Sequence, residues 1–334
     1  MNAEEESVLR LMREDNLRAG FPFAPRGVWE KLCHDFDANF RVHGVPREDI
    51  AYFNQSFSQS PPGNPRYHRY AVYMLYRLIK QRDASDLLGR FDLSSDTGYE
   101  IAIDGRRYSW DTLISLDTIL SIAEADPGIL TDRRVVADLG SGWGRIGYVL
   151  KRINPRVSYL LLDLPEILMI SMAVLPRLLP AESTSLYAEF RAMPALTKSM
   201  LLQKGLWFAG SQDLLKVADG AIDVFINVAS FQEMKLAQVR TYFDLIDRKV
   251  SGIFYTQQYV VVSDAQRPYN AIGGLEQYPF KSQWTEHFKR YTTFSERFFE
   301  AGFGVNQSSR PVCPLPTLPA SVPVPLLQAT TAVI

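Results

Sequence analysis

Apolar positions in the first part of the chain recur at helical intervals. Helices are predicted on this basis over residues 3–19, 27–43, 66–80 and 109–125. Asp104 and Gly105 are typical turn residues, and they predict a hairpin between Tyr99 and Tyr108. The first 130 residues are therefore expected to be mainly helical.

From about residue 133 the pattern changes to short, continuous apolar runs that alternate with helical stretches. The runs cover residues 135–139, 158–164, 223–229 and 252–262. Continuous apolar strands separated by helices indicate a parallel sheet that is covered on both faces. A last helix is predicted over residues 294–303, and the proline-rich stretch 311–325 is expected to be extended chain.

These patterns together predict an α/β protein with a Rossmann-like sheet and helices in front of it. We divide the chain into a helical cap or substrate lid (residues 1–130), a Rossmann-like domain (131–310) and a proline-rich tail (311–334).

Composition narrows the class of protein. The 334 residues are 46% hydrophobic and 22% charged, which is typical of a soluble globular chain, and the net charge of −1 argues against binding to nucleic acid or anionic lipid. Cys33 and Cys313 lie far apart, so neither a disulfide framework nor a metal site is expected.

The acidic start lacks the features of a signal peptide, and no apolar run reaches the ~18 residues that span a membrane. We therefore expect a cytoplasmic protein with a small-molecule partner, either as a monomer or as a homo-oligomer.

The segment V-V-A-D-L-G-S-G-W-G-R-I-G, residues 135–147, contains two overlapping glycine patterns. From Asp138 it is D-x-G-x-G-x-G, which is typical of S-adenosylmethionine sites, and from Gly142 it is the dinucleotide pattern G-x-G-x-x-G. Glycines allow a tight turn and close ligand approach, and the following helix offers free N–H groups. The loop residues Gly140, Ser141, Gly142 and Gly144 are therefore predicted to bind a cofactor.

Three features favour the methyl donor over a nicotinamide. Asp138 at the strand end would orient the loop and the cofactor's ammonium, whereas it would repel a pyrophosphate. Trp143 is bulky for the tight part of the dinucleotide pattern, and Gly147 is better explained by helix packing. The third feature is Asp163, which ends the next strand, where an acid can accept both ribose hydroxyls; by itself it does not separate the two cofactors, because both carry a ribose. Leu164 beside it is assigned to the same site.

Polar residues follow two later strands. Gln212 and Asp213 resemble the polar or acidic residue that class I methyltransferases place against the adenine amino group, although a helix cap at Ser211 explains this stretch almost as well. The strand 223–229 ends in a polar cluster that includes Asn227 and Glu233, and such strand ends face the ligand crevice of an open α/β sheet. We assign Asn227 to the cofactor.

Three stretches carry a resemblance to a known family: D-L-G-S-G-W-G-R-I-G-Y-V-L-K, L-L-D-L-P-E-I-L and I-N-V-A-S-F-Q-E-M. They resemble the class I methyltransferases of the sugar O-methyltransferase family, as do stretches between residues 52 and 120. The D-L-P-E piece is also similar to small-molecule O-methyltransferases, in which the matching aspartate, Asp163 here, binds the ribose. The resemblance implies a class I methyltransferase sheet, S-adenosylmethionine as cofactor, and a sugar or another small hydroxylated metabolite as acceptor.

Methyl transfer to a hydroxyl requires a base. His287 and Glu233 are the two candidates, while a surface histidine and an ordinary helix N-terminal acid are the alternative explanations. Tyr255, Gln257 and Trp284 are candidate acceptor contacts, or core residues. Three other functions stay open: a C- or N-methyltransferase for an apolar, aromatic or prenyl acceptor, a nicotinamide oxidoreductase, and a non-catalytic protein that keeps the fold.

Overall fold

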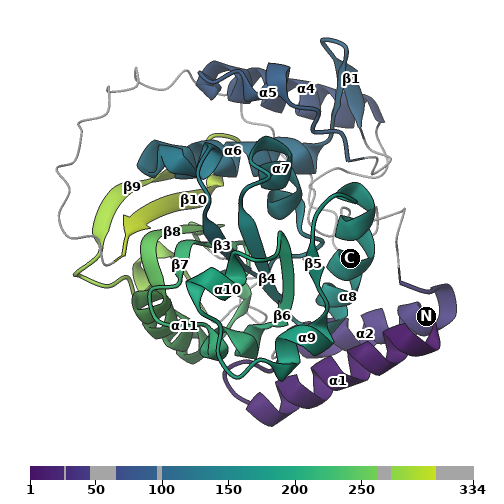
Figure 1. The fold of residues 1–334 in the computed structure, drawn as a ribbon. Coiled ribbons are helices and arrows are strands. Elements are labelled where there is room, and N and C mark those ends of the chain that lie inside the picture. The colour runs from purple at the N-terminus through teal and green to yellow at the C-terminus, as the bar shows by residue number, and fades with distance from the viewer. Residues whose placement is uncertain (26–27, 46–64, 96–99, 262–271, 306–334) are drawn as a thin grey trace.

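The computed structural model describes residues 1–25, 28–45, 65–95, 100–261 and 272–305 (Figure 1). The N-terminal elements match the predicted helices and hairpin. They are α1 (Ala3–Ala19), α2 (Val28–His43), α4 (Pro65–Arg82), α5 (Leu87–Arg90), β1 (Ile101–Ile103), β2 (Arg106–Tyr108) and α6 (Trp110–Ala125). Ser109 caps α6, because its hydroxyl accepts the N–H of Thr112 at 3.1 Å.

An eight-stranded sheet forms the centre of the molecule, in the order β5-β6-β4-β3-β7-β8-β10-β9. All neighbouring pairs from β5 to β8 are parallel, and β10 runs antiparallel to both of its neighbours. The strands are β3 (Val135–Leu139), β4 (Ser158–Asp163), β5 (Thr184–Ser185), β6 (Leu206–Gly210), β7 (Ile222–Val228), β8 (Val250–Tyr259), β9 (Thr285–Thr292) and β10 (Ser295–Gly304). The predicted α/β Rossmann-like fold with helices before the sheet is confirmed.

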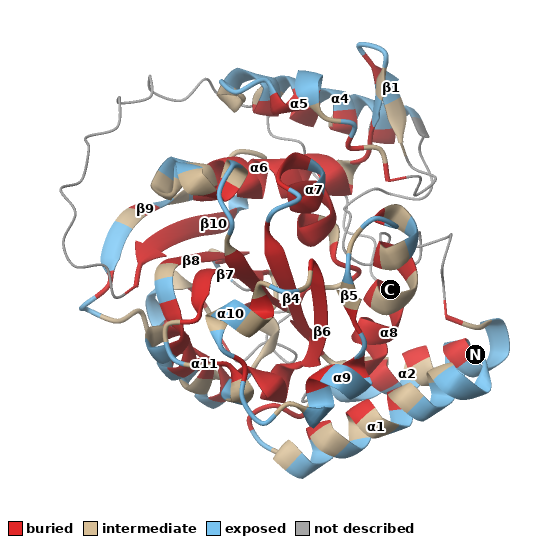
Figure 2. Ribbon diagram, viewed as in Figure 1, coloured by how far each residue is buried: buried red, intermediate tan, exposed pale blue. Residues whose placement is uncertain are grey.

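Helices cover both faces of this sheet, which explains the continuous apolar runs in its strands. Alternate strand residues belong to two core clusters: Val136 and Leu161 pack on one face, and Val135 and Leu160 on the other. The first face is covered by α6, α7 (Arg145–Ile153) and α8 (Pro165–Leu178), and the second by α9 (Tyr187–Ala192), α10 (Lys198–Leu201) and α11 (Leu236–Lys249). Figure 2 shows the strands buried between these layers. Short 3-10 helices lie in the connections, among them η1 (Pro127–Leu130), η2 (Ser211–Lys216) and η4 (Leu275–Gln277).

The helix predicted over residues 294–303 is wrong, because this segment is strand β10. β10 lies inside the sheet between β8 and β9, so residues 298–304 are buried on both faces. A run such as F-F-E-A-G-F has no period-2 alternation under these conditions, and sequence spacing alone does not separate it from a buried helix.

The N-terminal helices lie in two separate places rather than in one layer. α1 and α2 pack on α8, and α4 packs on α6, which itself lies on the sheet beside α7 (Figure 1). One core cluster runs continuously from Leu9 through α6 to Phe288. The division at residue 130 stays a prediction, and the predicted tail lies outside the described residues.

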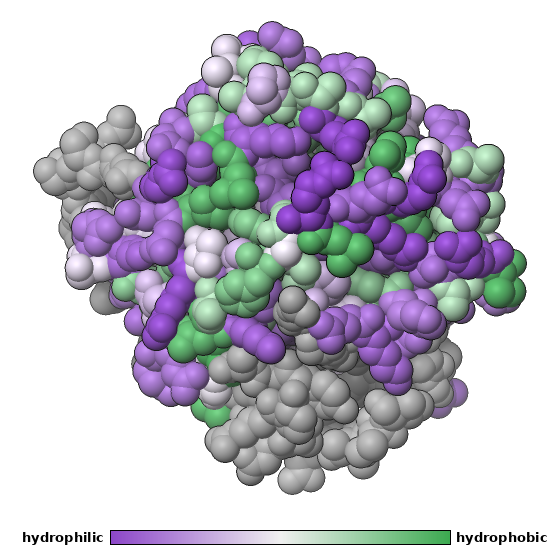
Figure 3. Space-filling view, turned by 90° about the horizontal axis from the view of Figure 1, so that it is seen from below, coloured by the Kyte–Doolittle hydropathy of each residue, from purple (hydrophilic) through white to green (hydrophobic). Residues whose placement is uncertain are grey.

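The surface beneath α1, α9 and α11 is mainly hydrophilic. In Figure 3 its hydrophobic side chains form small, separate groups among charged and polar ones. Among the described residues, no helix has the length and apolar character needed to cross a membrane.

Candidate cofactor and acceptor site

A cavity lies at the carboxyl ends of β3, β4 and β7, where an open parallel sheet places its ligands. The glycine loop, Asp138, Asp163 and Leu164 line its floor. Other parts of the chain add to the walls, among them the segment Pro22–Pro25 with Trp29, the start of α6, and the β9–β10 hairpin. The cavity therefore joins residues from both ends of the described chain.

The glycines of the loop have backbone conformations that other residues rarely adopt. Gly140, Gly142 and Gly144 have φ values of 74°, 60° and 90°. A Cβ atom on Gly140 would lie 2.3 Å from the Oγ of Ser230, and one on Gly144 would lie 2.5 Å from a methyl group of Leu175. Gly144 is also the N-cap of α7, so the loop ends at the positive end of that helix.

Asp138 supports the loop from below rather than standing free. Its carboxylate accepts a hydrogen bond from the hydroxyl of Tyr159 at 2.7 Å, and burial raises its pKa to about 6. The ring of Tyr159 lies so close to α7 that a Cβ on Gly147 would be 2.7 Å from it. Gly147 thus serves helix packing, as the sequence predicted, and it does so against the residue that holds Asp138.

Asp163 fixes the shape of the glycine loop. One of its oxygens accepts the N–H of Gly142 at 2.8 Å, and the other accepts the N–H of Leu164 at 2.7 Å. Burial raises the pKa of this carboxyl to about 7, although the two backbone bonds oppose that shift. The hydroxyl of Ser141 is buried in the same loop and has no hydrogen-bond partner among the described residues. A buried, unpaired hydroxyl beside a cavity is the kind of group that a polar ligand satisfies.

Glu233 adds a further, partly buried acid to the cavity. It ends the 3-10 helix η3 (Phe231–Glu233), which follows Ala229, a non-glycine residue with φ of 55°. Its Oε2 accepts the indole N–H of Trp29 at 2.7 Å, and burial raises its pKa to about 7. A carboxyl with a pKa near neutrality is suited to taking a proton from a ligand.

Trp29→Phe tests this contact. Its hydrogen bond lowers the pKa of Glu233, so the substitution raises that pKa further. If ionised Glu233 is the base, the acid limb of the kcat/KM–pH profile moves to higher pH, and activity at pH 6 falls about three- to tenfold. Trp110→Phe is the matched control, because Trp110 lines the same cavity but, among the described residues, its indole does not donate to Glu233. An unchanged acid limb in Trp29→Phe would separate Glu233 from the reaction.

Four aromatic side chains form another part of the cavity wall. Trp110 contacts Phe294 edge-on at 6.1 Å between ring centres, and Phe294 lies 6.0 Å from Phe298. Both phenylalanines come from the β9–β10 hairpin, and all three line the cavity together with Trp29. Gln257 at the end of β8 adds a polar group there. This side fits an acceptor with an apolar or aromatic body.

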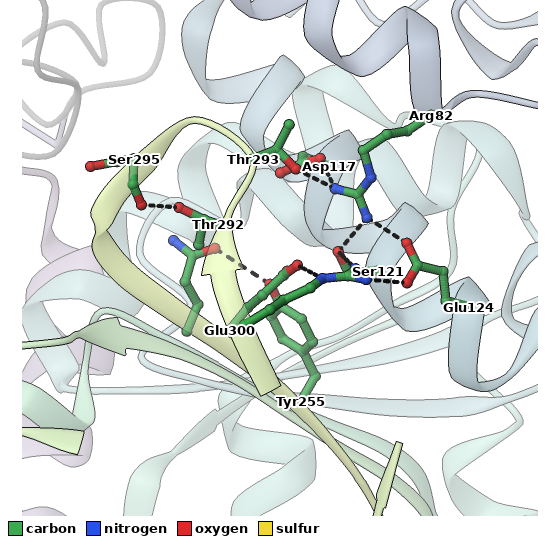
Figure 4. Close-up of polar contacts among 11 residues, drawn as sticks. Arg82, Asp117, Ser121, Glu124, Tyr255, Thr292, Thr293, Ser295 and Glu300 are labelled. Carbon is green, nitrogen blue, oxygen red and sulfur yellow. Dashed lines mark hydrogen bonds and ion pairs between the residues drawn. The ribbon is translucent and has the colours of Figure 1, made fainter. Parts of the chain in front are cut away.

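Ion pairs beneath the hairpin hold it in place (Figure 4). Arg82 at the end of α4 donates to Glu124 of α6 and to Thr293 of the hairpin turn, both at 2.6 Å, and it also pairs with the buried Asp117. Arg290 of β9 bridges Glu124 at 2.7 Å and Glu300 at 2.8 Å. The turn that carries Phe294 is thereby tied to two N-terminal helices.

Several predicted cofactor residues lie beside the cavity without lining it. The amide of Asn227 donates to the carbonyl of Leu139 at 2.8 Å and so joins β7 to the end of β3. Asp213 accepts the N–H of Gly210 at 3.0 Å and pairs with Lys216 at 2.9 Å. Gln212 accepts a bond from Asn16 at 3.0 Å. Within this stretch it is Ser211 that lines the cavity.

Of the three predicted acceptor contacts, one lines the cavity and two do not. Gln257 lines the cavity, whereas Tyr255 is fully buried behind it and donates to Glu300 at 2.9 Å. Trp284 packs on the far side of the sheet, stacked on Phe243 at 5.6 Å, and its indole N–H donates to Asp247 at 2.7 Å. His287 lies on the edge strand β9, outside the residues that line the cavity. We therefore assign Tyr255, Trp284 and His287 no role at this cavity.

Sequence reasoning missed residues that line the cavity from the N-terminal half and from the hairpin. Asp111 in the first turn of α6 is buried, accepts the indole N–H of Trp143 at 3.3 Å and has a raised pKa because of its burial. Arg145 at the start of α7 also lines the cavity, and it donates to Ser115 at 3.0 Å. Asp111 could have been noticed in the sequence as an acid at the start of a predicted helix. However, an acid in the first turn is also explained by its favourable interaction with the helix dipole.

Comparison with known proteins adds little beyond the fold. The sequence matches no protein-family model and no curated protein. Solved structures that resemble it include a SAM-dependent methyltransferase from Aquifex aeolicus, with 12% identity, 69% of this chain and 98% of that chain covered, and a TM-score of 0.37. A geranyl diphosphate methyltransferase in complex with GPP and sinefungin covers 57% of this chain and 78% of its own at 11% identity, with a TM-score of 0.40. At these TM-scores and identities the comparison bears on the fold and not on the activity.

Proposed function

We propose that this protein is an S-adenosylmethionine-dependent O-methyltransferase for a small metabolite, with Glu233 as the base. The observation that carries the proposal is the pairing of two acids in one cavity. Asp163 holds the glycine loop, and Glu233, whose pKa is about 7, lines the same cavity.

The residues of the cavity fit this cofactor. The glycine loop leaves no room for a Cβ at Gly140, and the unpaired hydroxyl of Ser141 offers a hydrogen bond to a polar group. Asp163 would accept the ribose hydroxyls, and Asp111 and Arg145 offer opposite charges to the two ends of an amino acid. When bound, the cofactor supplies an electrophilic methyl group on a sulfonium.

The chain's own part in the chemistry is to orient the acceptor, exclude water and remove a proton. Burial keeps Glu233 near the point of half-ionisation at neutral pH, so its carboxylate accepts the hydroxyl proton of an acceptor as the oxygen attacks. Trp29 fixes the orientation of that carboxylate. The aromatic walls align the acceptor and exclude bulk water.

The shape of the acceptor side favours an apolar or aromatic body that carries the hydroxyl. Trp110, Phe294 and Phe298 provide the walls. A sugar, which the family resemblance suggests, would rely on Glu233, Gln257 and Ser230 for its hydroxyls and on ring stacking for the rest. A second candidate, C-methylation of an apolar acceptor, is supported by the same aromatic lining. Its carbon attacks without a base, and the proton is lost afterwards from the carbocation that forms.

Two measurements test the proposal. Calorimetry with S-adenosylhomocysteine is expected to show binding that Gly140→Val abolishes, because the new side chain would collide with Ser230. Transfer of a labelled methyl group to a panel of phenols, sugars and prenyl compounds then identifies the acceptor class. Binding of NADH without binding of S-adenosylhomocysteine would overturn the proposal.

A further inference from the structure

The segment Pro22–Pro25, between α1 and α2, lines the cavity on the side beyond Asp163. Pro22, Phe23 and Ala24 are buried, whereas the preceding Phe21 is half exposed. The ring of Phe23 contacts that of Tyr242 edge-on at 5.8 Å, and Tyr242 lies near enough to Asp163 for that carboxylate to influence its pKa, which burial chiefly raises. The segment is thus close to the predicted ribose acid.

Side chains from three different elements hold this segment by its carbonyl groups. The carbonyl of Phe23 accepts from Asn16 of α1 at 3.2 Å and from Ser211 of η2 at 3.3 Å. The carbonyl of Pro22 accepts from Gln238 of α11 at 2.7 Å. Proline has no N–H, so this stretch does not pair with the sheet, and side-chain donors satisfy its buried carbonyls instead.

The helices on either side are fixed to the Rossmann-like part of the molecule. On α1, Arg13 pairs with Glu166 of α8 at 2.7 Å and Asp15 pairs with Arg191 of α9 at 2.5 Å. On α2, Trp29 donates to Glu233. The segment is therefore a bridge with both ends attached (Figure 1).

We propose that Pro22–Pro25 forms the wall of the adenine part of the cofactor site, so that this N-terminal segment is a cofactor-binding element. The inference rests on the proposed function. Phe23, Tyr242 and Leu164 present apolar surface beside an acid, as a flat base next to its ribose requires, and Ser211 provides a hydroxyl. Trp29 follows the segment closely in sequence, so the adenine wall and the partner of the base belong to one connected piece of chain.

Calorimetry with S-adenosylhomocysteine and with adenosine tests the assignment. Phe23→Ala and Gln238→Ala are each expected to weaken both ligands about tenfold or more, because the first removes the wall and the second leaves a buried carbonyl without its donor. Phe21→Ala is the matched control, since this neighbouring ring is 51% exposed and does not line the cavity. It should bind both ligands like the native protein.

The outcomes separate the inference from the proposed function. If the native protein fails to bind S-adenosylhomocysteine, the proposed function falls and the inference with it. If the native protein binds it, and folded Phe23→Ala and Gln238→Ala bind it equally well, the adenine wall is overturned while the proposed function stands. Should Phe23→Ala not fold, as judged by thermal unfolding, Gln238→Ala decides alone. If the two variants lose affinity for S-adenosylhomocysteine but keep it for adenosine, the assignment is also contradicted, because an adenine wall must contact both ligands.

Discussion

Glu233→Gln is expected to lower kcat by about 10²- to 10⁴-fold while leaving the affinity for S-adenosylhomocysteine unchanged, because a glutamine keeps the shape of the side chain and removes its basicity. The acid limb of the native kcat/KM–pH profile, with an apparent pKa of about 7, should disappear in the variant. Activity in the native protein therefore rises with pH through 7, as Glu233 loses its proton. Steady-state rates between pH 5 and 9 measure both effects.

Two controls accompany this measurement. His287→Ala removes the other base predicted from the sequence, and it should retain the native rate, because His287 lies on an edge strand away from the cavity. Full activity in Glu233→Gln would instead favour C-methylation, in which the carbon attacks before any proton is lost and the carbocation that forms then loses its proton to another acceptor.

The same substitution separates catalysis from folding. The pKa of Glu233 is raised from 4.5 to about 7, so its contribution to stability is present below about pH 4.5 and is lost as pH rises through 7. Above pH 7 the folded protein carries a partly buried, ionised carboxylate at position 233, which lowers its free energy of unfolding. Glu233→Gln removes this charge, so without ligand the variant should unfold at a higher temperature than the native protein at pH 8. At pH 5 the advantage should be largely absent. A variant that is both inactive and less stable at pH 8 would indicate that Glu233 has a structural role.

Asp163→Asn is expected to weaken binding of S-adenosylhomocysteine about 100-fold. Both carboxylate oxygens accept backbone N–H groups, whereas an asparagine has one acceptor oxygen and would face the other N–H with its own donor. The glycine loop would lose a fixed point, and the ribose an acceptor. Calorimetry at pH 8 measures the loss.

Asp223→Asn is the matched control for this experiment. Asp223 is also a buried sheet carboxylate that accepts a backbone N–H, from Val135 at 2.9 Å, but it lies at the opposite end of β3. It should reduce stability without affecting ligand affinity. Equal losses of affinity in both variants would mean that Asp163 acts through general stability of the sheet.

The sequence predicted the part of the site in which function depends on consecutive residues. The strand, glycine loop and helix of residues 135–147 form one local unit, and Asp163 is recognisable because it ends the next strand. The packing role of Gly147 was also predictable. Gly147 is the last glycine of the dinucleotide pattern, and the bulky Trp143 argued against phosphate binding by that pattern.

The remainder depends on contacts between distant segments. Trp29 meets Glu233 across more than 200 positions, and no spacing within a single sequence reports such a pair. The contact of Gln212 with Asn16 was not predictable either, because the position of α1 could not be inferred, and the assignment of Gln212 to the adenine stays a prediction. The error over residues 294–303 concealed the hairpin, and with it Phe294 and Phe298.

Helix α6 is buried along almost its whole length, and the elements that cover it are synthesised at very different times. α4 precedes it, but β10 and the ion pairs of Arg290 come from the last described part of the chain. At ~5–20 residues per second on a ribosome, β10 follows α6 by roughly ten to thirty seconds. During that interval α6 can pack only on its near neighbours in the chain, above all α4 and α7. The hairpin therefore completes the cover of α6 last, after most of its helical contacts have become available.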